Sequence, residues 1–199
     1  MRTLALELSS AQGSIALLDG EQRLFVSEWA NDRKDSGPFF EHLQGCLQKF
    51  DNPERIVVGL GPGSYAGTRI AIAAAIGLQA ATGAALIGLP SLCAMPTTAS
   101  KYMVVGDARR ESFFFALVEE RRCIEGPLLC TSEELTERLD TLDCPVFAAE
   151  PLPNFPTVVL IYPSAILLAQ LATATSISIA PLEPIYLREP HITSPAGPK

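Results

Sequence analysis

Histidine is scarce in this 199-residue sequence: there are only two, His42 and His191, and neither lies in a motif. Zinc hydrolases need several metal ligands and a base at fixed spacing, so this scarcity argues against a metallohydrolase. The five cysteines form no CxxC pair and their number is odd, which argues against a zinc knuckle and against a disulfide framework. We therefore expect scattered reduced thiols, as in a cytoplasmic protein.

Long uninterrupted apolar runs are also lacking. Residues 70–100 contain no charged side chain, but Gly83, Gly88, Pro90 and Pro96 interrupt them. A membrane-spanning helix needs about 20 apolar residues in succession. The N-terminus lacks the basic start, apolar block and small-residue cleavage site of a signal peptide. We expect no membrane segment and a cytoplasmic location.

Basic residues are fewer than acidic ones, 15 against 22, which gives a net charge of −7. Phosphate contacts supply most of the affinity of nucleic-acid-binding proteins, so a chain this acidic is expected to bind nucleic acid poorly on its own. A complex in which a partner supplies the positive charge is not excluded. Hydrophobic residues make up 48% of the chain and charged residues 19%, a composition that builds a core and excludes a disordered protein.

The order of apolar segments predicts two related α/β units. In the first half we expect strands at 4–9, 14–18, 24–29, 55–60 and 84–88 and helices at 39–50 and 68–82. In the second half we expect strands at 102–106, 112–118 and 146–149 and helices at 131–139 and 164–173. Each half opens with a strand, a carboxylate (Glu7 or Asp107), a polar turn and a return strand. This repeat fits a duplicated unit of mixed sheet and flanking helices.

A glycine-rich segment, Gly59 to Arg69, links a predicted strand to a predicted helix. Glycines let a backbone approach a ligand closely and a helix N-terminus attracts anions, so a phosphate site is one interpretation. The spacing matches neither the P-loop nor the dinucleotide-binding motif, and Ala66 stands where a serine nucleophile elbow needs glycine. The local residues favour the other interpretation, a tight connection between strand and helix.

The predicted helix that follows has no charged residue between Ile70 and Thr82. Surface helices normally keep one polar side, so such a helix is either enclosed in the core or covered by a partner. Few helices can be enclosed in a chain of this size. We therefore favour docking of a partner, with a core position as the alternative.

Four stretches resemble, in order, the TsaB (YeaZ) family, whose members are the non-catalytic partners of TsaD in bacterial tRNA threonylcarbamoyladenosine (t6A) synthesis. They are LALELSSAQGSIALL at 4–18, GPGSYAGTR at 61–69, DARRESFFFA at 107–116 and PIYLR at 184–188. Their combination is far more specific than any one motif. The resemblance implies an α/β actin-like ATPase (ASKHA, ribonuclease H-like) fold. It implies two subdomains, residues 1–99 and 100–199, with a C-terminal segment able to return to the first.

The resemblance also implies a scaffold that activates TsaD by docking, without catalytic residues, metal or cofactor of its own. TsaD transfers the threonylcarbamoyl group to N6 of adenosine 37, so tRNA would be bound only through the complex. A TsaE-type ATPase is the further partner that the family implies. Candidate interface residues lie on two predicted helices of the first half: Phe39, Phe40, Leu43, Ile70, Ala74, Gly77 and Leu78.

The polar turns depart from the family pattern. Glu7 stands where the family usually has Asp, and the glycine that commonly precedes Glu111 is absent. We interpret the phosphate loop as vestigial, with candidate residues Glu7, Ser9, Ser10, Gly61, Gly63, Ser64, Gly67 and Asp107. ATP or ADP with Mg²⁺ is not indicated, and peptidase activity is rejected because the paralogue's histidine pair is not visible. Two alternatives stay open: an actin-fold nucleotide-binding enzyme such as a small kinase, and a homodimer through the same apolar helix.

Overall fold

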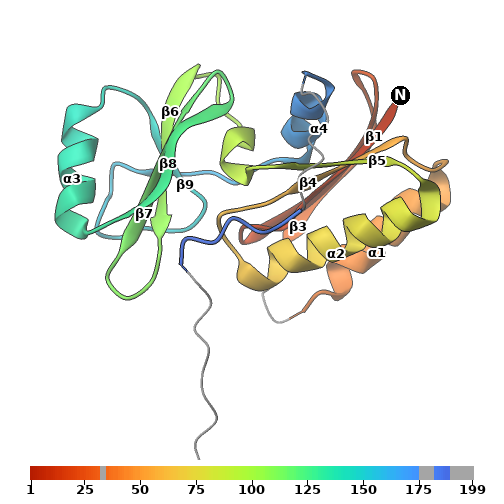
Figure 1. Cartoon of the computed structure of the whole chain (residues 1–199), viewed down its shortest axis with the longest axis horizontal. Helices are drawn as coiled ribbons and strands as arrows, with labels where there is room; N and C mark the ends of the chain where they lie inside the picture. Colours follow the sequence, from red (N-terminus) through yellow and green to blue (C-terminus); the bar gives the residue numbers. More distant parts are fainter. Residues whose placement is uncertain (32–34, 175–181, 189–199) are drawn as a thin grey trace, which may run out of the picture.

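The structure is a computed structural model that describes residues 1–31, 35–174 and 182–188. Two five-stranded sheets lie next to each other along the long axis of the molecule (Figure 1). The first sheet contains β1 (Arg2–Glu7), β2 (Gln12–Asp19), β3 (Gln22–Ala30), β4 (Arg55–Gly59) and β5 (Ala85–Leu89). The second contains β6 (Lys101–Asp107), β7 (Phe113–Glu119), β8 (Arg122–Cys130), β9 (Val146–Ala148) and β10 (Val159–Leu160).

Both sheets have the same strand order, β3-β2-β1-β4-β5 in the first and β8-β7-β6-β9-β10 in the second. In each sheet the first strand pairs antiparallel with the second and parallel with the fourth. The predicted duplication and the predicted fold class, mixed sheets flanked by helices, are therefore confirmed. Glu7 and Asp107 end the equivalent strands β1 and β6.

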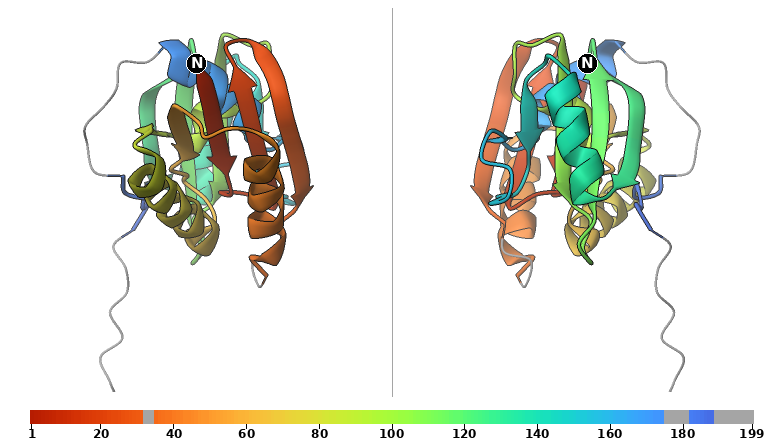
Figure 2. Two further views of the ribbon diagram at one scale, coloured as in Figure 1. Left: turned by 90° about the vertical axis from the view of Figure 1, so that its right-hand side faces the viewer. Right: turned by 90° about the vertical axis from the view of Figure 1, so that its left-hand side faces the viewer.

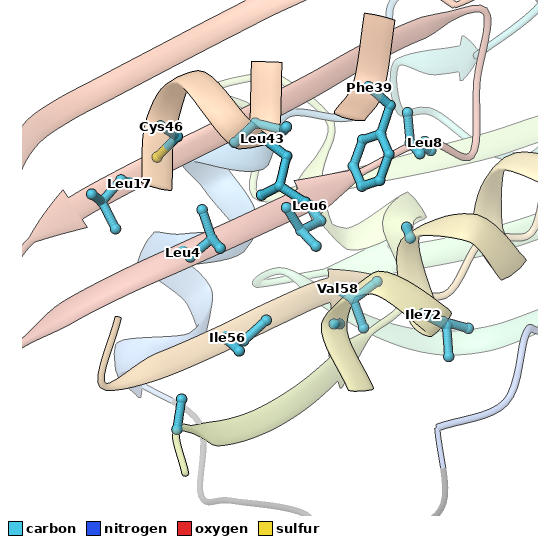
Figure 3. Close-up of a cluster of buried hydrophobic side chains, with 14 residues drawn as sticks. Leu4, Leu6, Leu8, Leu17, Phe39, Leu43, Cys46, Ile56, Val58 and Ile72 are labelled. Atoms are coloured by element: carbon cyan, nitrogen blue, oxygen red, sulfur yellow. The ribbon is translucent and has the colours of Figure 1, made fainter. Parts of the chain in front are cut away.

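Helices α1 (Gly37–Lys49) and α2 (Tyr65–Thr82) cover one face of the first sheet. Because side chains alternate along a strand, Leu4 and Leu6 of β1 point toward these helices, whereas Ala5 points to the opposite face. Figure 3 shows Phe39 and Leu43 of α1 directed at the leucines of β1. This cluster is the main core of the first half.

A second layer of helix lies between the two sheets. There α4 (Ala165–Ala174) packs on the first sheet, and the 3₁₀ helix η1 (Ser91–Ala94) contacts both sheets. Helix α3 (Ser132–Thr141) covers the outer face of the second sheet. The views from the two ends show α1 and α2 at one end and α3 at the other (Figure 2). The predicted subdomain boundary, between residues 99 and 100, falls between β5 and β6. That this position divides two domains stays a prediction.

The charge-free stretch 70–100 forms most of α2 together with β5 and η1. No helix in the described ranges combines the length and the hydropathy that a membrane span requires. The five cysteines are free thiols, and burial raises the pKa of Cys46 to about 11 and that of Cys93 to about 12. Buried thiols of this kind are chemically inert at neutral pH.

Helix α2 begins at Tyr65, three residues before the predicted start. The Ser64 side chain accepts a hydrogen bond from the Gly67 amide at 3.2 Å and so caps the first turn. The Leu8 carbonyl oxygen approaches the same turn so closely that a Cβ atom on Gly67 would lie 2.1 Å from it. Glycine in this turn therefore serves close packing between α2 and the end of β1.

Replacement of Gly67 by alanine tests this close approach. The added Cβ would force the Leu8 backbone and α2 apart, so we expect a loss of about 2 kcal/mol in the free energy of unfolding, or roughly 4–8 °C in Tm. Gly77 lies in the same helix with no atom within 4 Å of an added Cβ, and Gly77→Ala is expected to raise stability by up to about 1 kcal/mol. Thermal unfolding of both variants checks the pair. Equal shifts would contradict the packing argument.

Candidate functional site

Two loops at one end of the first sheet close against each other. The Ser64 amide donates a hydrogen bond of 2.6 Å to the Ser9 carbonyl oxygen, which joins the loop before α2 to the turn after β1. A Cβ atom on Gly63 would lie 2.1 Å from that same oxygen, and a Cβ atom on Gly67 would lie 2.1 Å from the Leu8 carbonyl oxygen. Backbone atoms therefore occupy the side of Gly63 and Gly67 toward which a Cβ atom would point.

The hydroxyl groups of these loops bind neighbouring backbone groups. Ser10 Oγ donates to the Gln12 carbonyl at 2.9 Å, and Ser64 Oγ is engaged by the Gly67 amide. The Gly61 amide donates to Ser91 Oγ at 3.0 Å. The structure thus brings together all members of the predicted phosphate loop on the first sheet. Their contacts with one another support the interpretation of residues 59–69 as a tight connection between β4 and α2.

Glu7 lies beneath these loops and is fully buried. Its Oε1 atom accepts a hydrogen bond of 2.6 Å from the Ser9 amide, while Oε2 has no hydrogen-bond partner. A Cβ atom on Gly59 would lie only 1.9 Å from Oε2, so the carboxyl group occupies the space that this glycine leaves open. Burial raises the pKa of Glu7, and the hydrogen bond from the Ser9 amide opposes that rise. Burial thus favours the neutral form of this carboxyl group.

A cavity of about 480 Å³ lies between the two sheets, within the range of small-molecule sites. Residues Ser9, Ser10 and 62–66 line its wall on the first sheet, and Asp107 and Arg109 line its wall on the second. Residues 184–188 also line the cavity. Asp107 is the one predicted phosphate-loop residue that reaches the cavity from the second sheet. Glu7 is absent from its lining.

The Asp107 turn is internally paired. Its carboxylate accepts a hydrogen bond of 2.7 Å from the Arg109 amide and lies 3.3 Å from the Arg109 guanidinium, while the Asp107 amide donates to Glu150 Oε1 at 3.0 Å. Arg109, Arg110 and Glu111 all have positive φ angles, of 66°, 55° and 57°, without a glycine among them. Among the described residues no group of three or more His, Cys, Asp or Glu side chains is placed to hold a metal ion.

Residues 182–188 bring the C-terminal motif to the start of α2. The Ile185 amide donates to the Leu60 carbonyl at 2.8 Å, and Arg69 Nε donates to the Tyr186 hydroxyl at 2.9 Å. The Arg69 guanidinium also lies 3.7 Å from the centre of the Tyr65 ring. Tyr65, Arg69 and Tyr186 lie within the sequence motifs, but they are not among the predicted site residues. Nothing in a single sequence shows that residues 65 and 186 meet.

The exposed side of α2 carries almost no charge. We call it the α2 outer face: Ala66, Arg69, Ala73, Ile76, Gly77 and Ala80, all of them exposed. Arg69 is its only charged member and is engaged with the two tyrosines. Ile76 is 47% exposed.

The predicted interface residues separate into three groups. Gly77 lies on the α2 outer face, and Phe40 of α1 is 50% exposed. Ile70, Ala74 and Leu78 are half-buried and pack against the core. Phe39 and Leu43 are buried against the sheet, because α1 turns these positions toward β1 (Figure 3), and their place in a partner interface stays a prediction.

Glu7→Gln tests the neutral state of the buried acid. A raised pKa stabilises the folded chain fully below the unfolded-state pKa, about 4.3, and this contribution is lost as pH rises through the folded-state pKa. Glutamine keeps the neutral form at every pH. The variant should therefore gain stability relative to the parent as pH rises from about 4.3 toward the folded-state pKa, by up to about 1.4 kcal/mol per pH unit. Urea unfolding across this range measures the gain, and parallel pH curves would refute a neutral Glu7.

Comparisons with known proteins bear on both the site and the fold. The family model described as TsaD, tRNA N6-adenosine threonylcarbamoyltransferase, matches residues 41–135. An uncharacterized protein of Mycobacterium leprae (strain TN) is 32% identical over 140 residues, which are 69% of this chain and 38% of that protein. The chain thus spans well under half the length of this curated relative.

Two solved structures from Pseudomonas aeruginosa match nearly the whole chain. YeaZ has a TM-score of 0.70 at 20% identity, covering 94% of this chain and 100% of its own. A protein described as similar to peptidase YeaZ has a TM-score of 0.74 at 21% identity, covering 94% and 99%. At these identities the likeness establishes the fold. Together, the YeaZ fold and the TsaD-family match over residues 41–135 agree with the resemblance of this chain to the TsaB (YeaZ) family.

Proposed function

We propose that the chain is a scaffold subunit of the t6A synthesis complex and that it activates a TsaD-type paralogue by docking through the α2 outer face. The observation that carries the proposal is this face, which exposes Ala73, Ile76, Gly77 and Ala80 without a charge among them. Small side chains let the backbone of a partner helix approach closely, and Ile76 supplies apolar area at the centre of the contact. The acidic chain would meet tRNA through the complex, in the cytoplasm.

The polar turns support a non-catalytic role. The glycine loop packs against the carbonyl groups of Leu8 and Ser9, and Glu7 is buried away from the cavity. Asp107 is held by its own turn. None of these groups is arranged as a nucleophile with an adjacent base, which covalent catalysis needs. A TsaE-type ATPase would supply nucleotide hydrolysis in this proposal.

Peptidase chemistry finds no support in the described residues. His42 stacks on Trp29 with ring centres 4.6 Å apart, and its Nδ1 atom lies 2.9 Å from Ser27 Oγ. Its ring is thus part of the packing between α1 and β3. Ser64, the serine of the glycine loop, caps α2. His191 lies outside the described residues.

Ala73→Arg tests the docking face. A guanidinium at the centre of the apolar contact would be buried without a partner, and we expect binding to the TsaD-type paralogue of the same organism to weaken at least about 100-fold. t6A formation in the reconstituted reaction should fall in parallel. Isothermal titration calorimetry measures the affinity, and circular dichroism verifies that the variant is folded.

Thr136→Arg is the matched control. Thr136 is exposed on α3, at the opposite end of the molecule from α2 (Figure 2). The control should bind like the parent chain. Unchanged affinity of the Ala73→Arg chain would refute docking through this face, and loss of a homodimer with no effect on the paralogue would favour self-association.

A further inference from the structure

The α2 outer face carries a single charge, Arg69, among small and apolar side chains. A helix turns by about 100° per residue, so Tyr65, Arg69 and Ile76 lie within about 40° of one another around its axis. These three exposed side chains therefore form one stripe, which extends about 16 Å along α2. The charge stands near the N-terminal end of this stripe and belongs to the surface that would meet a docked partner.

The guanidinium group of Arg69 is held in place by two tyrosines. It stacks on the Tyr65 ring, 3.7 Å from the ring centre, and its Nε atom donates to the Tyr186 hydroxyl at 2.9 Å. The two tyrosine rings contact each other with centres 5.8 Å apart, and the Ile185 amide ties the segment around Tyr186 to the Leu60 carbonyl. An arginine that is positioned before binding loses less conformational entropy when a partner arrives.

Part of this guanidinium group is left for a further contact. Its face stacks on Tyr65 and its Nε atom binds Tyr186. The ion pairs among the described residues use other cations, and none of them includes Arg69. The two Nη nitrogens of Arg69 therefore offer donors in the planar geometry that a carboxylate accepts.

Docking through the α2 outer face would take this cation out of water. Burial of a charge is strongly unfavourable unless an opposite charge meets it. Helix α2 contains no acidic residue, so two copies of the chain that met α2 against α2 would bring two arginines and no carboxylate. The charge of the face thus favours a different chain, one that brings a carboxylate opposite Arg69.

We propose that Arg69 determines the specificity of docking by forming an ion pair with an aspartate or glutamate of the TsaD-type paralogue, beside the apolar contact at Ile76. Tyr65 and Tyr186 hold the guanidinium group in position for this pair. The proposal rests on the proposed docking through α2. It adds the chemistry that the partner must present, an apolar surface with one carboxylate at its end.

Calorimetry of the Arg69→Gln chain with the paralogue, at about 0.05 M and about 0.5 M NaCl, tests the ion pair. Glutamine is a good helix former, and circular dichroism verifies that the variant folds. We expect binding to be about tenfold or more weaker than that of the parent chain at low salt, because a charge-assisted contact is lost. The difference should narrow at high salt, because salt screens the pair in the parent complex.

Two further variants separate charge from structure. Arg122→Gln is the matched control, because Arg122 is exposed on β8 of the second sheet and the substitution changes the net charge equally. It should bind like the parent chain at both salt concentrations. Arg69→Lys keeps the charge but loses the planar donors, so it should bind more weakly than the parent while retaining the salt dependence of the parent.

Charge reversal gives an independent readout, also if Arg69→Gln fails to fold. Arg69→Glu should abolish binding to the unmodified paralogue, because two carboxylates would then face each other. Replacement of one exposed aspartate or glutamate of the paralogue by arginine should restore binding of the Arg69→Glu chain. The position that restores it identifies the partner carboxylate.

The outcomes distinguish this inference from the docking proposal on which it rests. Equal affinity of the parent and Arg69→Gln chains, or a loss of the same size at both salt concentrations, would overturn the ion pair while docking through α2 stands. Failure of the parent chain to bind the paralogue would refute docking itself, and the ion pair with it.

Discussion

The first turn of α2 touches the carbonyl groups of Leu8 and Ser9, and the remaining features of the first half depend on that contact. Only glycine at positions 63 and 67 permits it, because an added Cβ would lie 2.1 Å from a carbonyl oxygen in either case. The contact sets the height and direction of α2 on the sheet. One side of the helix is thereby buried against β1 and β4, and the α2 outer face is left toward solvent.

The same contact determines what the polar turns can do. In a duplicated fold the ends of β1 and β6 occupy equivalent places, yet Glu7 and Asp107 meet different surroundings. Glu7 is enclosed under the closed loops, where burial raises the pKa of its carboxyl group, whereas Asp107 borders the cavity and pairs with Arg109.

Much of this fold could be predicted because local signals agreed with packing, as in the alternating strands at 4–9 and 14–18. β8 was missed because Gly126 and Pro127 interrupt its apolar pattern, and β10 because it has only two residues. The burial of Phe39 and Leu43 could not be predicted, because their orientation depends on how α1 rotates over β1. The meeting of Tyr65 with Tyr186 is a contact between distant segments, which no local pattern encodes. The unusual surface of α2, in contrast, could be predicted because the sequence has no charged residue between Ile70 and Thr82.

The central claim is that α2 serves as a docking surface for a TsaD-type paralogue. Light scattering on size-exclusion fractions of the chain, alone and mixed with that paralogue from the same organism, tests it most directly. The account predicts a stable 1:1 species in the mixture, with a mass equal to the sum of the two chains. Separate elution of the two proteins at micromolar concentration, with the chain unchanged as a monomer or homodimer, would contradict it.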